Sequence, residues 1–127
     1  MRRIIRFEND VSFIESAAVG GREERRGPLG EFFDFCDDND RFGMKTWEAA
    51  EAEIARMSLN LAMKKASLKS DDLDVLLAGD LENQCVASSC GLYSFGIPYI
   101  GLYSACSTAT EALLILSNMI IKRYQIL

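Results

Sequence analysis

The chain has 127 residues, of which 49% are hydrophobic and 26% are charged, and its formal net charge at pH 7 is −5. This length and balance predict one folded domain with a core of its own. The acidic charge argues against a nucleic-acid partner, which requires a basic face. The sequence contains no histidine. A cysteine–histidine pair for thiol catalysis therefore cannot be completed from these residues alone.

No targeting or membrane-spanning segment is expected. Arg6 interrupts the apolar start of the chain, and the longest apolar stretch, 112–121, is far shorter than the ~18 residues that a span requires. We therefore expect a protein that is cytosolic or peripheral to a membrane. In such a protein four cysteines are expected to be free thiols, and their irregular spacing fits no zinc site. They are Cys36, Cys85, Cys90 and Cys106.

Residues 1–45 are predicted to be mostly irregular. The segment 11–14 (Val-Ser-Phe-Ile) is expected to form a strand that enters the core, and the glycines of 20–21 and 27–30 indicate a long loop. An acidic cluster follows, made of Asp34, Asp37, Asp38 and Asp40. Its spacing lacks the glycine and the closing glutamate of a calcium loop, so we expect a solvated loop anchored by its phenylalanines.

The clearest predicted helix covers 46–66. Thr46 is a suitable N-cap, and acidic residues at the start and Lys64 and Lys65 at the end match the helix dipole. Apolar residues recur at three- and four-residue spacing, namely Trp47, Ala50, Ile54, Met57 and Leu61. One face of this helix is therefore expected to be buried.

The second half of the chain alternates strands and helices. The apolar runs 74–78 and 97–102 predict two buried strands, and 81–94 predicts a short helix whose small residues allow close packing. A last helix, 107–122, follows the second strand. This order predicts an α/β layered domain with a parallel sheet.

The last predicted helix is apolar on nearly every face, which is typical of a helix buried in the middle of a protein. Few residues follow it, so we expect either another chain or a continuation of the natural protein to cover it. At its N-terminus, backbone N–H groups point outward and the helix dipole is positive. Cys106 at this position is either a nucleophile or anion contact, or an inert packing residue.

Other polar residues near these elements have two interpretations each. Ser107 and Thr108 either cap the last helix or contact a ligand. Asp80 and Asn83 follow a parallel strand at its carboxyl end, where ligands bind in such sheets, although structural hydrogen bonding is the favoured role. Cys85 and Cys90 are expected to be packing residues.

Several groups of residues also carry a resemblance to a known family. They are Gly27-Pro28-Leu29-Gly30 with Phe33-Asp34, Lys45-Thr46-Trp47-Glu48 with Ala50-Glu51, Leu77-Ala78-Gly79-Asp80-Leu81 with Asn83-Gln84, Gly96-Ile97-Pro98, and Ala105-Cys106-Ser107-Thr108. In this order and spacing the chain resembles the stage V sporulation protein AD family, a branch of the thiolase-like (ketoacyl-synthase-like) fold. The resemblance covers residues 11–121. The departures are Ser104, where a glycine is usual, and Thr110, where methionine is more common.

The resemblance implies a fold in which two similar βαβαβ halves stack as an α-β-α-β-α sandwich. The chain, 1–127, would be most of the N-terminal half, with an irregular part, 1–45, and an αβαβα part, 46–127. The helix after Cys106 would then be the buried central layer, covered by the missing C-terminal half or by the second chain of a homodimer.

The resemblance also implies a function. The family assists the uptake of dipicolinic acid, as its calcium chelate, into the developing spore, and works with other stage V sporulation membrane proteins. The chain would then lie in the forespore or spore, at the cytosolic face of the inner membrane or peripheral to it. No enzymatic activity is expected, and no cofactor or metal beyond the calcium of the chelate.

Cys106 matches the nucleophile position of the thiolase fold, and Ser107 matches the serine beside it. With Thr108, these residues are the expected ligand-binding site, because dipicolinate is a flat dianion and a helix N-terminus with hydroxyls suits a carboxylate. The alternative is a fragment of a thiolase-like acyltransferase that uses Cys106 as acyl acceptor and is inactive without the C-terminal half.

Overall fold

The computed structural model of the chain describes residues 10–81 and 84–124. The helices and strands follow in the order β1 (Val19–Gly20), α1 (Arg22–Arg26), β2 (Phe35–Cys36), α2 (Trp47–Ala66), β3 (Leu76–Ala78), α3 (Val86–Leu92), β4 (Tyr99–Gly101) and α4 (Thr108–Tyr124). Short 3-10 turns occupy Gly30–Phe32, Ser70–Asp72, Tyr93–Phe95 and Ala105–Ser107. The predicted α/β class is confirmed.

Both strand pairs are parallel. β1 pairs with β2, and β3 pairs with β4, with Leu76 opposite Tyr99 and Ala78 opposite Gly101. A helix connects the strands of each pair, as parallel pairing requires. Within the part of the chain that the structure describes, the two pairs form separate two-stranded sheets. The predicted parallel pairing is therefore confirmed, but the strands are shorter than expected and only half-buried at β3.

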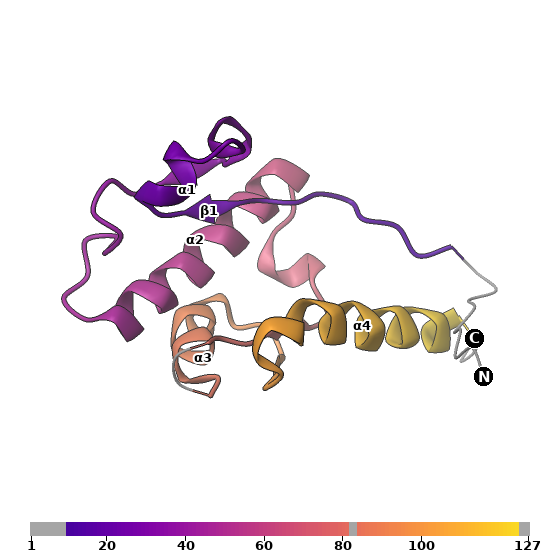
Figure 1. Cartoon of the computed structure of the whole chain (residues 1–127). Helices are drawn as coiled ribbons and strands as arrows, with labels where there is room; N and C mark the ends of the chain where they lie inside the picture. The colour runs from indigo at the N-terminus through magenta and orange to yellow at the C-terminus, as the bar shows by residue number, and fades with distance from the viewer. Residues whose placement is uncertain (1–9, 82–83, 125–127) are drawn as a thin grey trace, which may run out of the picture.

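The prediction of a strand at 11–14 is wrong. These residues form no strand, and Phe13 and Ile14 are each 81% exposed. The strand forms later, at Val19–Gly20, where Phe35–Cys36 supplies the pairing partner. The 11–14 segment instead runs beside the outer part of α4, as Figure 1 shows, so its apolar side chains have no partner strand to order them.

The helix α2 begins and ends where its caps predict. The Thr46 hydroxyl accepts a hydrogen bond from the Ala49 N–H at 3.2 Å, and Ser67 ends the helix in the left-handed conformation. Its buried face is narrower than expected, because only Ala50 among the residues of the helix is buried and Trp47 is half-exposed. Figure 1 shows α2 lying between the α1–β1 unit and α3, both of which it contacts.

Small residues bring α2 and α3 close together. A Cβ atom at Gly91 would lie 2.1 Å from the carbonyl oxygen of Ala52, so the backbones of the two helices are in direct contact here. The buried apolar side chains of the described residues lie mainly around this contact and the strand ends. They are Cys36, Phe42, Ala50, Ala87, Leu92 and Leu102. The close packing expected from the small residues of 81–94 is confirmed.

The expected burial of the last helix is not found within the residues that the structure describes. α4 forms as predicted, but Leu113 and Leu114 are each 45% exposed, and Met119 and Ile120 are exposed on a later turn. Figure 1 shows α4 extending beyond the other helices. Its apolar pattern therefore exceeds what the described residues can cover. Across these residues, no helix combines the length and the apolar character needed to cross a membrane.

The acidic loop is held by its own backbone. The Asp37 carboxylate accepts hydrogen bonds from the N–H groups of Asn39, Arg41 and Phe42 at 3.0 to 3.2 Å, and Asp38 pairs with Arg25. The hydrogen bond from the Phe42 N–H contributes most to lowering the pKa of Asp37. Asp37, Asp38 and Asp40 therefore lie in a loop as expected, although Phe35–Cys36 forms β2. Phe32, Phe33 and Phe35 were expected to anchor this loop, but Phe32 and Phe35 are exposed, and Phe42 is the phenylalanine that is buried.

Asp34 gives the fold a pH dependence. Its carboxylate accepts from Lys65 Nζ at 2.9 Å and from the Ala18 N–H at 2.8 Å, and these bonds lower its pKa below the ordinary 3.8. A carboxyl group whose pKa is lower in the folded state stabilises the fold at pH values above its unfolded-state pKa. This stabilisation is lost as the pH falls through the folded-state pKa. We expect Asp34→Asn to lower the thermal midpoint at pH 7 but to change it less at pH 2 to 3, measured by circular dichroism. An equal loss at both pH values would contradict this.

Candidate functional site

A cavity of about 390 Å³ lies where the carboxyl end of β3 meets the start of α4. It is lined by Glu51, Leu77, Ala78, Gly79, Asp80, Leu81, Ala105, Cys106, Thr108, Ala109 and Ala112. These residues lie on α2, on and after β3, on the turn before α4 and on the first turns of α4. The cavity therefore contains the position that α/β proteins use for ligands.

The turn before α4 presents Cys106 at the cavity. Ala105 adopts a left-handed conformation with φ of 44°, which is unusual for a residue with a Cβ atom. The first backbone bond of the turn runs from the Ser107 N–H to the Ser104 carbonyl at 2.9 Å. The N–H groups of Ala105 and Cys106 precede that bond, as orphan donors do at a helix start. Cys106 is exposed, so its thiol is not buried among the described residues.

The two hydroxyls of the predicted site differ in their position. Thr108 lines the cavity with Cys106, and its hydroxyl donates to the Ala105 carbonyl at 2.7 Å. The Ser107 hydroxyl donates to the Ser104 carbonyl at 2.7 Å and lies 2.6 Å from the Ser104 hydroxyl. Both hydroxyls thus stabilise the turn by donating to it. In an N-cap the hydroxyl oxygen accepts a hydrogen bond from a backbone N–H of the helix. The bonds of Ser107 and Thr108 instead run from the hydroxyl to a backbone carbonyl.

Asp80 has the structural role that the sequence favoured. It is 5% exposed, and its carboxylate accepts from the Cys85 N–H at 3.1 Å and from the N–H and hydroxyl of Ser88, both at 2.9 Å. The Ser88 hydroxyl lies 2.8 Å from the Tyr99 hydroxyl, which donates to the Ala78 carbonyl. Burial raises the pKa of Tyr99. This network joins β3, α3 and β4 behind the cavity; Asn83 lies outside the described residues.

A glycine lets the end of β3 approach the start of α4. A Cβ atom at Gly79 would lie 2.2 Å from the Leu102 carbonyl oxygen and 3.0 Å from the Thr108 methyl carbon. No larger residue fits without a shift of the backbone. Gly79 therefore lets the end of β3 lie against the Leu102 backbone, just after β4, and close to Thr108 at the start of α4. Ser104, at the position where the resemblance expected a glycine, has a φ of −133° and needs no such freedom.

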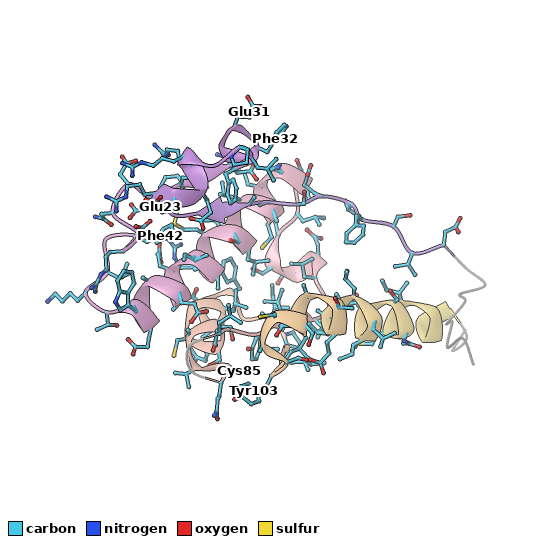
Figure 2. All side chains as sticks on the ribbon, in the orientation of Figure 1. Glu23, Glu31, Phe32, Phe42, Cys85 and Tyr103 are labelled. Carbon is cyan, nitrogen blue, oxygen red and sulfur yellow. The ribbon has the colours of Figure 1, made fainter. Side chains whose placement is uncertain are left out.

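The four cysteines are free thiols, as predicted. Cys85 is half-buried and its thiol donates to the Leu102 carbonyl at 2.9 Å. Figure 2 shows Cys85 and Tyr103 at the same end of the molecule, below α3 and the start of α4. Cys36 is buried. Cys90 was expected to be a packing residue, but it is exposed in the groove between α2 and α3. Across the described part of the chain, no cluster of three or more acidic, cysteine or histidine residues is placed to hold a metal ion.

Sequence reasoning missed one residue of the cavity, Glu51. Its Oε1 accepts from the Leu81 N–H at 2.9 Å, while Oε2 is buried without a hydrogen-bond partner. Glu51 lies on α2 and is 55 positions before Cys106 in the chain, so no local pattern connects the two residues. A carboxylate within the otherwise small and apolar 49–52 segment was the available signal.

Comparison with known proteins identifies the family. The family model described as Stage V sporulation protein AD (SpoVAD) matches residues 1–125. The chain belongs to this family. The Stage V sporulation protein AD of Bacillus subtilis (strain 168) is 35% identical to it over 114 residues. That match covers 90% of the chain but 34% of the relative, so the chain spans about a third of the length of this relative.

Proposed function

We propose that the chain is part of a sporulation protein that assists the uptake of dipicolinic acid into the developing spore. In this proposal it binds calcium dipicolinate in the cavity beside Cys106. The observation that carries the proposal is the meeting of the β3 carboxyl end and the α4 start around one cavity that contains Cys106 and Thr108. Membership of the stage V sporulation protein AD family supports the role in sporulation.

The lining of the cavity suits the shape and charge of this ligand. Dipicolinate is a flat pyridine ring with two carboxylates beside the ring nitrogen. Backbone N–H groups at the positive end of α4, on Ala105 and Cys106, are suitable donors to a carboxylate. Leu77, Ala109 and Ala112 provide apolar surface for the ring. The residues proposed to bind the ligand are thus Cys106 and Thr108, with Ser107 holding the turn.

The wider assembly is part of the same proposal. We propose a thiolase-like layered arrangement in which α4 is a central layer, covered by the C-terminal half of a family-length protein or by a second copy. The exposed apolar residues of α4 support it. Other stage V sporulation membrane proteins are the proposed partners, at the inner membrane of the spore.

An acyl-transfer role is the second candidate, and the exposed Cys106 thiol at a helix start favours it. The chain has no histidine, so a histidine base for this thiol has to come from elsewhere. The binding role needs no such base and uses the groups that the cavity already contains. We therefore propose binding without catalysis.

Protection of the Cys106 thiol tests the proposed site. The chain is alkylated with iodoacetamide with and without calcium dipicolinate, and the labelled peptides are quantified by mass spectrometry. At a ligand concentration of about nine times Kd, mass action predicts about tenfold slower labelling of Cys106. Cys90 is also exposed but lies outside the cavity, and its labelling is expected to stay constant. Equal labelling of Cys106 in both samples would contradict the proposal.

A further inference from the structure

The turn that carries Cys106 contains a strained residue. Ala105 has a φ of 44°, in the left-handed region that residues with a Cβ atom avoid. Residues in such conformations persist only where the surrounding contacts hold them. On the side of α4 the turn is held by the bond from the Ser107 N–H to the Ser104 carbonyl and by the Thr108 hydroxyl, which donates to the Ala105 carbonyl. The turn therefore needs a second hold on the side of β4.

Leu102 provides this second hold. It is 5% exposed and is the last buried residue before Cys106, since Tyr103 is 70% exposed. Its N–H donates to the Ala78 carbonyl at 2.9 Å, and its carbonyl accepts from the Cys85 thiol at 2.9 Å. The backbone that enters the turn is thus fixed at Leu102, and the residues between Leu102 and Ala105 are free to transmit strain between the two points.

Tyr99 stabilises the carbonyl to which Leu102 is bound. The Tyr99 hydroxyl donates a second hydrogen bond to the Ala78 carbonyl, at 3.2 Å. The ring reaches this carbonyl by passing along Gly101, where a Cβ atom would lie 3.2 Å from Tyr99 Cε1. The phenol oxygen is also 2.8 Å from the hydroxyl of Ser88, which is 1% exposed. Burial raises the pKa of Tyr99, so the phenol keeps its proton and remains a donor at neutral pH.

We propose that Tyr99 is a positioning residue for the turn that carries Cys106. Its hydroxyl fixes the Ala78 carbonyl, this carbonyl fixes Leu102, and Leu102 keeps Ala105 in the left-handed conformation that presents Cys106 at the cavity. Tyr99 is not among the residues that line the cavity, so it acts through the backbone. The inference goes beyond the proposed function, because it concerns the geometry of the chain itself and holds for any molecule that the cavity binds.

Amide hydrogen exchange, measured by NMR in the absence of ligand, tests this role. Tyr99→Phe keeps the ring and removes the hydroxyl. The N–H groups of Leu102 and Ser107 are expected to exchange about tenfold faster in this variant, the factor that corresponds to the loss of about one hydrogen bond. Unchanged exchange of the two groups would overturn the inference.

Two controls separate positioning from a general loss of stability. Tyr93→Phe makes the same chemical change at a residue that is 88% exposed, and it is expected to leave the exchange of Leu102 and Ser107 as it is. Amides in the middle of α2 are expected to keep their rates in Tyr99→Phe. An equal rise throughout α2 would mean that the hydroxyl supports the whole fold, and the inference would then be wrong.

A rescue experiment tests the strain itself. Glycine adopts a positive φ without the penalty that a Cβ atom brings, so Ala105→Gly removes the strain from the turn. In the double variant that combines Tyr99→Phe with Ala105→Gly, the exchange of the Leu102 N–H is expected to return toward its rate in the unaltered chain. A rate as fast as in Tyr99→Phe alone would contradict the inference, because the strain at Ala105 would then not act on Leu102.

The conformation of Ala105 can also be observed directly. The NOE between the amide and α protons of one residue is strongest when its φ is positive, because the two protons are then closest. This NOE of Ala105 is expected to be strong in the unaltered chain and in Tyr93→Phe, and weaker in Tyr99→Phe. The same strong NOE in Tyr99→Phe would show that the turn does not depend on the hydroxyl, which would also overturn the inference.

Discussion

Replacing Asp80 by alanine is expected to lower the free energy of unfolding by about 3 kcal/mol, since buried charged acceptors are worth about 1.5 to 3 kcal/mol per hydrogen bond. The Asp80 side chain is 5% exposed and accepts three hydrogen bonds, from Cys85 and Ser88. Alanine removes the acceptor of the Cys85 and Ser88 N–H groups, whereas the Ser88 hydroxyl still has the Tyr99 hydroxyl beside it. The Ser88 residue is itself 1% exposed, so water reaches it poorly.

Urea unfolding followed by circular dichroism measures this effect. Asp71→Ala is the control, because Asp71 lies in the exposed 3-10 turn Ser70–Asp72. A surface change of this kind is expected to cost less than about 0.5 kcal/mol. A loss in Asp80→Ala no larger than in the control would show that the network does not hold β3, α3 and β4 together.

Replacing Gly91 by alanine is expected to destabilise the fold by about 2 kcal/mol. The added Cβ atom would meet the Ala52 carbonyl oxygen at 2.1 Å, so α2 and α3 must move apart. Overpacking of this kind costs about 1 to 3 kcal/mol or more, and the better helix propensity of alanine offsets about 1 kcal/mol of it. Because α2 carries Glu51, the shift also alters the cavity.

Gly27→Ala is the control for this substitution. A Cβ atom at Gly27 would lie 3.3 Å from the Glu24 carbonyl oxygen, and the residue has a φ of −71° that alanine adopts freely. The midpoint of urea unfolding is expected to fall clearly for Gly91→Ala and little for Gly27→Ala. Equal midpoints for the two variants would mean that the α2–α3 contact adjusts without cost.

Local signals predicted the helices well. Thr46 as N-cap and the lysines of the last turn defined α2 almost to the residue, because caps and dipole complements act within one turn. The apolar pattern likewise predicted α4. Neither signal indicates which elements pack against the apolar face of the helix. The described residues bury little of α4, although its pattern predicted full burial.

The strands were harder to predict because a strand needs a partner. The 11–14 segment is mostly apolar and was expected to form a strand, yet pairing occurs at Val19–Gly20, where Phe35–Cys36 lies opposite. Strand stability comes from the neighbouring strand and the face it covers, and both are set by tertiary structure. A local pattern therefore indicated the type of structure but not its place.

The candidate site was predicted in part. The sequence placed Cys106 and Thr108 at a helix start, and the carboxyl end of β3 near a ligand position, from the order of elements alone. It did not predict Glu51, because this carboxylate joins the cavity through a contact distant in the chain, the hydrogen bond from the Leu81 N–H. Nor did it predict the positive φ of Ala105, a conformation usually signalled by glycine.

The central claim is that calcium dipicolinate occupies the cavity beside Cys106, and the alkylation rate of this thiol tests it most directly. The rate is measured as the concentration of calcium dipicolinate is raised, with Cys90 of the same molecule as internal reference. The proposal predicts that the Cys106 rate falls along a saturable curve while the Cys90 rate stays constant. A Cys106 rate that does not change at any ligand concentration would contradict the proposed site.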